Sequence, residues 1–127
     1  MKKDELIKEC LVFPESTVSY PYGPDCEVIK NKAGKSFALI GMCEVDAMKR
    51  SCGADAPIEE GDVFITLKCP PALIFVLRDK YKAVLPGYYS NKMHWNTIIP
   101  GKDVPDEEIK KMIQMSYDLV TPQKKAK

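Results

Sequence analysis

The sequence predicts one domain that combines α-helices with β-strands. Three observations carry this prediction: helical periodicity near both ends of the chain, β-rich runs between them, and an ordinary globular composition. The 127 residues are 45% hydrophobic and 29% charged, which suits one compact core that needs no disulfide or metal to hold it. We therefore expect a single domain over residues 1–127, with a basic, frayed tail from about residue 121.

The first segment, Lys3 to Val12, is predicted to be a helix because its apolar residues recur on one face. These residues are Leu6, Ile7, Cys10 and Leu11. Phe13 should end the helix, since the residue that precedes a proline avoids the α region. The segment Pro21 to Asp25 holds too many breakers for regular structure and is predicted to be a turn.

A β-hairpin is predicted next. Two apolar, β-rich runs, Cys26 to Lys30 and Ser36 to Met42, enclose a turn at Asn31 to Lys35. We expect a short helix over Glu44 to Ser51 and then a loop from Cys52 to Gly61, where glycine, proline and acidic residues gather.

Three further elements follow from local pattern. Asp62 to Lys68 alternates apolar and other residues and is predicted to be a strand. Trp95 to Ile99 is also predicted to be a strand, closed by a Pro-Gly pair. Pro105 to Val120 is predicted to be a helix, because a proline in the first turn and three acidic residues after it suit the positive end of a helix dipole.

Pro70 to Tyr81 fits two structures. The apolar run in its middle has the residue types of a buried strand, whereas the prolines before it and the charges after it favour a helix. As a helix, it should turn Leu73, Val76 and Leu77 toward the sheet and leave Ile74 and Phe75 partly exposed to solvent. Such an exposed apolar pair can mark a contact surface, so we expect a monomer or a weak homodimer through Ile74 and Phe75.

Charge and cysteine content limit the functions to consider. Nineteen basic and eighteen acidic residues leave a net charge of +1, so nucleic-acid binding would have to come from a local patch. The five cysteines have no C-x-x-C spacing, which predicts reduced, mostly buried thiols and no zinc ribbon; a bond between Cys43 and Cys52 stays open. Without an apolar run of signal-peptide or membrane length, we expect a cytoplasmic protein with no membrane contact.

One stretch of sequence is specific. Residues 86–97 read PGYYSNKMHWNT, which resembles the P-G-Y-x-x-N-K-x-H-W-N signature of the MmcQ/YjbR family. Other stretches are similar to family segments in the same order: an aromatic-Gly-Pro-Asp turn at Tyr22 to Asp25, a K-x-F-A-L strand at Lys35 to Leu39, an L-K-C segment at Leu67 to Cys69, and a final helix that starts near Val104.

The resemblance implies an α+β fold like that of frataxin (CyaY-like): a two-layer sandwich whose antiparallel sheet carries the N- and C-terminal helices on one face. It also implies DNA binding, because the family is described as double-wing DNA-binding proteins from the shape of its hairpins. That description is an analogy of shape, and a fold does not establish a function. The first helix mixes acidic with basic residues, unlike the acidic ridge of frataxins, so we expect no iron binding.

Two basic stretches are the candidate nucleic-acid contacts. Lysines in the predicted hairpin turn can meet phosphates as mobile point charges, although a solvated turn would look the same. From Arg78 to Trp95, basic residues alternate with aromatic ones, which suits phosphate contact and base stacking but also an aromatic core beneath surface lysines. The candidate residues are Lys30, Lys32, Lys35, Lys80, Lys82, Tyr88, Lys92, His94 and Asn96.

The sequence predicts no catalysis. His94 is the only histidine, and no motif supplies a nucleophile or an orienting carboxylate beside it. The G-K-S string that ends at Ser36 lacks the upstream glycine of a phosphate loop, so we expect no cofactor and no metal. Strand alternation should turn Trp95 into the core and place His94 and Asn96 on the opposite face.

Two functions stay open at this point. One is a non-catalytic protein that binds DNA weakly through phosphate contacts from basic hairpin wings. The other is a protein-interaction module with no nucleic-acid role. If the two basic stretches share one face of the folded domain, DNA binding is favoured; if they lie apart, the protein-interaction module is favoured.

Overall fold

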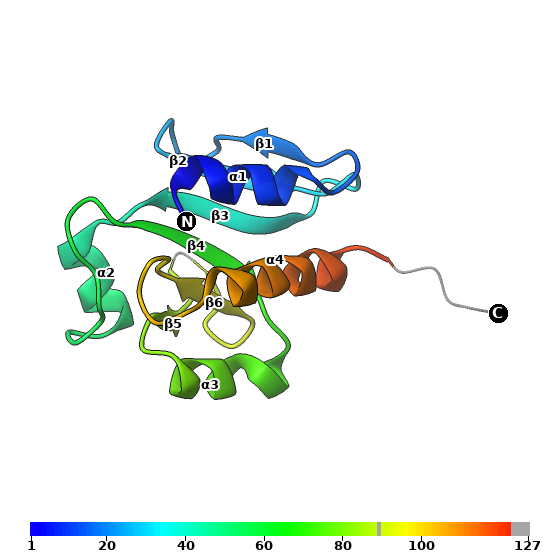
Figure 1. Ribbon diagram of the computed structural model, residues 1–127. Coiled ribbons are helices and arrows are strands. Elements are labelled where there is room, and N and C mark those ends of the chain that lie inside the picture. Colours follow the sequence, from blue (N-terminus) through cyan, green and yellow to red (C-terminus); the bar gives the residue numbers. More distant parts are fainter. Residues whose placement is uncertain (89, 123–127) are drawn as a thin grey trace.

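The fold is an antiparallel sheet with helices packed against it (Figure 1). The computed structural model describes residues 1–88 and 90–122. Along the chain the elements are α1 (Lys3–Leu11), β1 (Thr17–Ser19), β2 (Cys26–Lys30), β3 (Ser36–Met42), α2 (Val45–Cys52), β4 (Val63–Lys68), α3 (Pro71–Lys80), β5 (Val84–Pro86), β6 (Trp95–Ile98) and α4 (Asp106–Val120).

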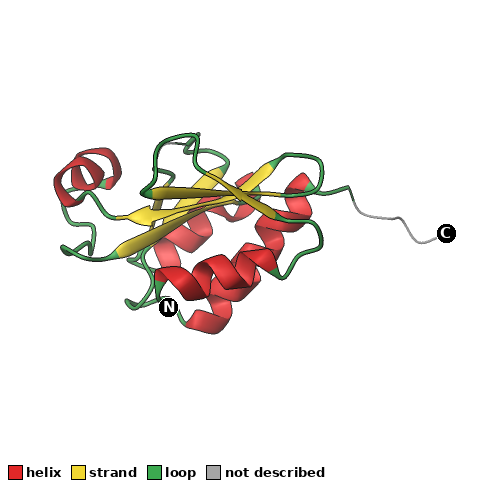
Figure 2. Ribbon diagram, turned by 90° about the horizontal axis from the view of Figure 1, so that it is seen from above, coloured by secondary structure: helices red, strands yellow, loops and turns green. Residues whose placement is uncertain are grey.

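The six strands lie in the order β1-β2-β3-β4-β6-β5, and every neighbouring pair is antiparallel. Figure 2 shows α1, α3 and α4 on one side of this sheet, whereas α2 lies on the other side, at one end. We call the side without the three helices the open face. The predicted α+β class, with the N- and C-terminal helices on one face, is confirmed.

The core forms between the sheet and the helices. Leu6 and Cys10 of α1 and Ile109 and Ile113 of α4 are buried against strand residues such as Ile40. These helix residues recur every three or four positions, so one face of each helix enters the core. The amphipathic pattern read from the sequence therefore predicted which face of α1 and α4 is buried.

The ambiguous segment is a helix, α3, but its predicted orientation is right for Leu77 and Phe75 only and wrong for Leu73, Ile74 and Val76. Ile74 is fully buried, whereas Leu73 and Val76 are 40% and 55% exposed. The buried stripe runs through Ile74, Leu77 and Arg78, which also have helical spacing. The sequence allows two overlapping helical stripes, one through Leu73 and one through Ile74 and Arg78. The second stripe packs against β5 and β6, because the Arg78 side chain has a polar partner in Asn96 of β6. Phe75 is 56% exposed, as expected.

Two strands were not predicted from the sequence. β1 and β5 have three residues each, too few to show an alternating pattern, and they form the two edges of the sheet. Of the expected basic tail, residues 123–127 lie outside the described residues. Across the described part of the chain, no helix combines the length and the apolar character that a membrane crossing requires.

Candidate functional site

The β2–β3 turn is fixed by Asn31, which is only 3% exposed. Its side-chain oxygen accepts a hydrogen bond from the Lys35 backbone N–H at 2.9 Å, which closes the turn. Its side-chain nitrogen donates to the Val120 carbonyl at 2.9 Å and to the Thr121 hydroxyl at 3.0 Å. Asn31 therefore ties the turn to the end of α4, and the lysines around it have a defined position.

The three turn lysines differ in their partners. Among residues 1–88 and 90–122, neither the exposed Lys35 nor the half-buried Lys30 takes part in an ion pair. Lys32 pairs with Glu15 at 3.2 Å, and both side chains are largely exposed. An exposed pair of this kind contributes little stability, so Lys32 can exchange Glu15 for another anion.

A second turn, residues 91–95, is also held by hydrogen bonds to an asparagine. The Asn91 carbonyl accepts hydrogen bonds from the backbone N–H groups of His94 at 3.2 Å and Trp95 at 3.0 Å. The Asn91 side-chain oxygen accepts a further one from the Met93 N–H at 2.8 Å. Three successive N–H groups thus converge on residue 91, and the bond to the side-chain oxygen is the one of the three that requires an asparagine or a similar side chain.

Arg78 of α3 holds the same turn from the helix side. Its Nε donates to the Asn96 side-chain oxygen at 2.7 Å, and its Nη2 donates to the carbonyls of Trp95, at 3.2 Å, and Lys92. The Asn96 side-chain nitrogen donates in turn to the Ile74 carbonyl at 3.3 Å. Burial lowers the pKa of Arg78 from its ordinary value, although nearby cysteines oppose this effect. The planar, multi-donor guanidinium suits these three acceptors in a way that a lysine would not.

The two turns leave the sheet at the same end. Ala38, just after the first turn, is aligned with Leu67 of β4, and Leu67 is aligned with Asn96, just after the second. The Cys69 N–H donates to the His94 carbonyl at 2.8 Å and continues this row beyond β4. The β2–β3 turn, which is the first predicted basic stretch, and residues 91–95 of the second basic stretch therefore lie at the same end of the sheet.

Lys80 and Lys82 lie at the opposite end of the sheet. They precede Val84, which is aligned with Ile98 at the far end of β6. The Lys82 backbone N–H donates to the Asp103 carboxylate at 2.6 Å, and the Lys80 ammonium lies 5.3 Å from the Tyr81 ring centroid. These lysines do not share a surface with the β2–β3 turn.

The remaining candidates differ in accessibility. The Lys92 ammonium donates to the Gly87 carbonyl at 3.1 Å and to the Ser51 hydroxyl at 3.4 Å. Tyr88 is 6% exposed and Asn96 is 2% exposed, so neither can reach a large ligand. His94 is exposed, and Tyr89, another aromatic of this stretch, lies outside the described residues. Among the described candidates at this end, the turn lysines, Lys92 and His94 are at least partly exposed, and Lys92 already has two hydrogen-bond partners.

Trp95 is half-buried, so the expectation that it is a core residue was wrong. Strand alternation places it on the same face as Thr97, and Thr97 lies opposite Thr66, with their hydroxyls 2.7 Å apart. Asn96 points the other way, toward Arg78 and α3. Gly87 backs the tryptophan so closely that a Cβ there would lie 2.8 Å from the Trp95 Cβ. The large side chain therefore sits on the open face.

Tyr22, from the turn between β1 and β2, reaches over the open face and lines two hollows there. The smaller hollow, of about 140 Å³, is bordered by Tyr22 and Trp95, with Ser36, Ser90 and Asn91 among its polar groups. The larger one, of about 480 Å³, is lined by other residues that include Asp25, Glu44, Phe64 and Tyr88. Sequence reasoning marked residues 21–25 as a turn, but no local signal showed that this turn folds back over the sheet.

Carboxylates gather away from the β2–β3 turn. Glu59 and Asp62 precede β4 and share Lys102, whose amine lies 2.5 Å and 3.1 Å from their oxygens. Hydrogen bonds from these two carboxylates raise the pKa of Lys102. Because β4 runs toward the 91–95 turn, its start lies at the other end of the sheet. These two carboxylates therefore lie far from the β2–β3 turn, at an end of the sheet that also holds basic residues such as Lys82 and Lys102.

The thiols are free, as predicted. Burial raises the pKa of Cys10 and of Cys43 to about 12, which keeps both protonated and unreactive at neutral pH. Burial also raises the pKa of Cys26, Cys52 and Cys69. Within the described residues, no three His, Cys, Asp or Glu side chains are grouped to hold a metal ion.

The fold is shared with solved structures. A Pseudomonas syringae protein superposes with a TM-score of 0.79 at 24% identity, covering 95% of this chain and 100% of the other. A Deinococcus radiodurans protein superposes with a TM-score of 0.71 at 26% identity, covering 92% of this chain and 76% of the other.

Sequence relatives agree with this likeness. The chain is 28% identical over 110 residues to YbdF of Escherichia coli O157:H7, and this alignment covers 87% of the chain and 76% of YbdF. It is 38% identical over 55 residues to YyaQ of Bacillus subtilis, and that alignment covers 43% of the chain and 46% of YyaQ. The model of the YjbR family matches residues 11–119, from the end of α1 to the end of α4. The chain therefore belongs to the YjbR family.

Proposed function

We propose that the protein is a non-catalytic DNA-binding protein that contacts phosphates through the β2–β3 turn. One observation carries the proposal: Lys30 and Lys35 lie on a turn that Asn31 holds in place, beside the 91–95 turn and away from the carboxylates around Lys102. Lysine ammonium groups bind phosphates as point charges and do not read base sequence.

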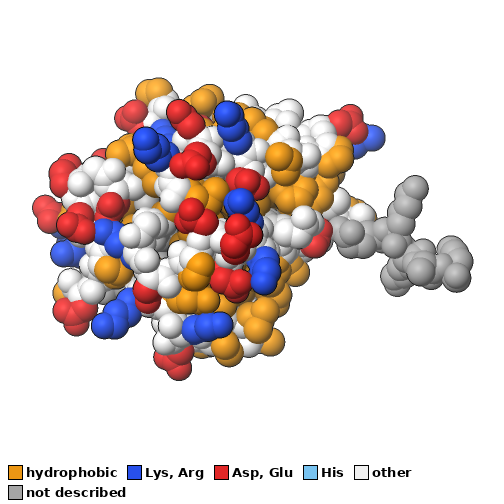
Figure 3. All heavy atoms as spheres, viewed as in Figure 1, with side chains coloured by type: hydrophobic (Ala, Val, Ile, Leu, Met, Phe, Trp, Pro, Cys, Tyr) orange, Lys and Arg blue, Asp and Glu red, His pale blue; other side chains and the backbone are white. Residues whose placement is uncertain are grey.

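The rest of the surface supports a small contact area. Figure 3 shows acidic and basic side chains intermixed over the helix-covered face, with no field of one sign. With a net charge of +1, the whole molecule gives little attraction to a polyanion. Binding should therefore be weak, confined to the turn, and strongly dependent on salt.

The test is a titration of a fluorescent 20-base-pair duplex at 50 mM and 200 mM salt. If Lys30, Lys32 and Lys35 each neutralise one phosphate, the logarithm of affinity should fall with that of salt at a slope near ~2.7. The double variant Lys30→Glu, Lys35→Glu should lose binding. The matched control, Lys80→Glu with Lys82→Glu, changes the net charge equally at the opposite end of the sheet and should keep it.

Three outcomes would contradict the proposal. The native protein could fail to bind at 50 mM salt, it could bind with no salt dependence, or the two double variants could lose affinity equally. Equal losses would mean that net charge, and not the β2–β3 turn, is responsible.

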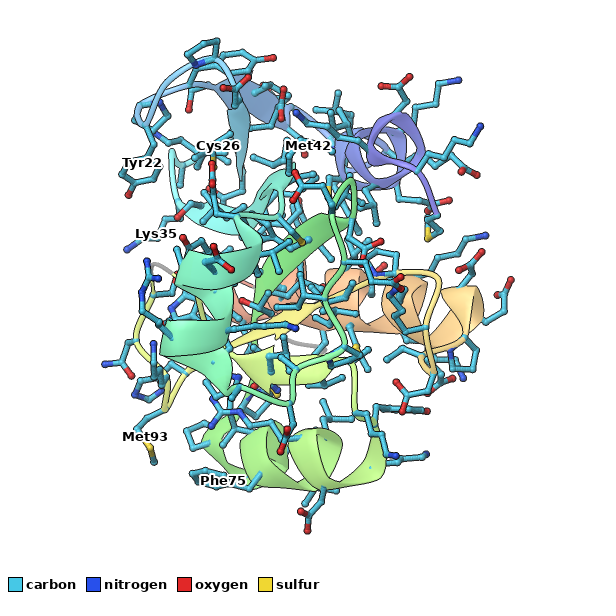
Figure 4. All side chains as sticks on the ribbon, turned by 90° about the vertical axis from the view of Figure 1, so that its left-hand side faces the viewer. Tyr22, Cys26, Lys35, Met42, Phe75 and Met93 are labelled. Carbon is cyan, nitrogen blue, oxygen red and sulfur yellow. The ribbon has the colours of Figure 1, made fainter. Side chains whose placement is uncertain are left out.

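A second candidate is a protein-interaction module that acts through α3. Leu73, Phe75, Val76 and the nearby Met93 are 40%, 56%, 55% and 50% exposed, and Figure 4 shows Phe75 and Met93 directed outward at the lower part of the molecule. Exposed apolar patches of this kind tend to mark contact surfaces. Ile74, which the sequence assigned to this surface, is buried and takes no part.

Molar mass in solution tests the second candidate in its simplest form, a homodimer. The native chain should associate as concentration rises, and the double variant Phe75→Glu, Val76→Lys should stay monomeric. A native chain that is monomeric at high concentration would exclude the homodimer.

A further inference from the structure

We infer that the smaller hollow of the open face is a slot for one unpaired nucleobase of a single strand. The inference rests on the proposed function, because it takes the neighbouring phosphates to lie on the lysines of the β2–β3 turn. It adds a preference for single-stranded over double-stranded nucleic acid, which phosphate contacts alone do not give.

Two aromatic side chains border the slot, together with the aliphatic Val28, Ala38 and Leu39. Tyr22, which is 69% exposed, and the half-buried Trp95 border the same hollow of about 140 Å³, although they come from turns at different places in the chain. Any base can stack on an aromatic side chain, because every base has a π-face, so such a site tolerates different sequences. In a duplex both faces of each base are covered by its neighbours, and the slot would be closed to it.

The lining also offers hydrogen-bonding groups for the edge of a base. Ser36 and Ser90 contribute hydroxyls, which both donate and accept, and Asn91 contributes an amide. The Asn91 side-chain oxygen already accepts from the Met93 N–H, so its nitrogen is the group that can donate to a ligand. Base edges carry acceptors and donors of matching kind.

The β2–β3 turn adjoins the slot. Ser36 lines the hollow and directly follows Lys35, and Figure 4 shows Tyr22 and Lys35 on the same side of the sheet. A strand whose base enters the hollow would thus carry its backbone past a lysine that has no ion-pair partner among the described residues. The larger hollow is a poorer place for this ligand, because Asp25 and Glu44 line it and would repel phosphates.

The Trp95 side of the slot is held in place by its neighbours. Gly87 backs Trp95, Arg78 donates to the Trp95 carbonyl, and the Asn91 carbonyl accepts from the Trp95 N–H. One wall of the slot therefore needs no rearrangement on binding, and the entropic cost of closing around a base is reduced.

The experiment uses the protein as its own reporter, since Trp95 is the only tryptophan of the chain. A 12-nucleotide single strand and its duplex are titrated at 50 mM salt, with Trp95 emission and the anisotropy of a label on the DNA both recorded. The test variant is Tyr22→Ala. The matched control is Tyr20→Ala, because Tyr20 lies in the same turn and is 51% exposed but does not line this hollow. Thermal melts establish that both variants fold.

The expected result is a tighter complex with the single strand than with the duplex, and a change in Trp95 emission with the single strand only. Tyr22→Ala should weaken single-strand binding between about 5-fold and 150-fold, which corresponds to one lost base–aromatic stack, and should leave duplex binding unchanged. Tyr20→Ala should behave like the native chain.

Equal affinity for the two forms, or equal effects of the two tyrosine variants, would overturn the slot and leave phosphate binding by the turn intact. Single-strand binding that depends on Tyr22, without any duplex binding, would support the slot and contradict the proposed duplex contact. If neither form binds the native chain, both proposals are wrong.

Discussion

The hydroxyl of Ser116 on α4 joins the backbones of two strands: it donates to the Phe37 carbonyl of β3 at 2.5 Å and accepts from the Lys68 N–H of β4 at 2.9 Å. Phe37 is the extra residue of a bulge, since Ile29 is aligned with Ala38 and Lys30 with Ser36. The serine therefore replaces the direct bond that would have continued the ladder between β3 and β4.

Ser116→Ala should destabilise the fold by about 1–3 kcal/mol, because it leaves buried backbone groups without a partner. Ser116 is fully buried, so water cannot easily replace its hydroxyl. Urea unfolding measures the free energy, with Gln114→Ala on the exposed side of the same helix as the control. A loss no larger than that of the control would show that the bridge contributes nothing.

Asn31→Ala should cost about 1–3 kcal/mol of stability through its lost hydrogen bonds. Asn31→Asp keeps the oxygen that accepts from Lys35 N–H but loses the nitrogen that donates to Val120 and Thr121. The aspartate variant should therefore preserve the turn and release the end of α4. Hydrogen exchange should therefore rise at the last turn of α4 in both variants, but at the Lys35 N–H in the alanine variant only. Exchange at the end of α4 that stays at the native rate in both variants would mean that Asn31 does not hold the helix.

Neighbouring residues of α3 should respond very differently to truncation. Ile74→Ala should destabilise the protein by about 2–5 kcal/mol, because it opens a cavity beside the sheet. Phe75→Ala should change stability by no more than about 0.5 kcal/mol, since its ring is mostly in solvent. Thermal melts of the two variants measure these changes in stability. Similar losses of stability for Ile74→Ala and Phe75→Ala would contradict the observed orientation of α3.

Stability should fall as the pH rises above 9. Burial raises the pKa of Cys10 from an ordinary 9.0 to about 12 in the folded protein. Between these values the unfolded chain releases the thiol proton and the folded chain keeps it, so unfolding is favoured by up to about 1.4 kcal/mol per pH unit. Cys10→Ala should show a shallower fall than the native chain in urea melts from pH 8 to pH 11. Parallel curves would mean that this thiol titrates normally.

Releasing Lys32 from Glu15 should strengthen phosphate binding. Glu15→Gln removes the carboxylate 3.2 Å from the Lys32 ammonium and should raise duplex affinity modestly at 50 mM salt, with a smaller gain at 200 mM. Glu107→Gln makes the same charge change beside Lys110 in α4 and serves as the control. An equal gain in both variants would assign the effect to net charge.

The sequence predicted the elements whose patterns are long and local. The hairpin and α4 show clear periodicity, and their bounds agree with the structure to within a residue. Side-chain orientation in α3 was not predictable, because Ile74 and Leu73 both belong to plausible helical stripes. The orientation of α3 depends on the hydrogen bond between Arg78 and Asn96, which are 18 positions apart and meet only in the folded chain.

The candidate site was predictable only in part. The lysines of the β2–β3 turn stand out by composition, but the sequence could not show that Lys92 is engaged by Gly87 or that Lys80 lies at the other end of the sheet. Tyr22 was missed for a different reason. Its place over the open face depends on how the β1–β2 turn folds back, and β1 itself is too short to be recognised.

The two short edge strands limit how this fold can assemble. A long, flat edge presents a row of free N–H and C=O groups that can recruit a strand from another chain. Here β1 and β5 offer three residues each, and β5 ends in Pro86, which has no N–H and whose carbonyl accepts a hydrogen bond from the Cys52 thiol of α2. Growth of the sheet by strand addition is thereby disfavoured, which protects the protein against edge-to-edge aggregation and leaves its faces and turns for recognition.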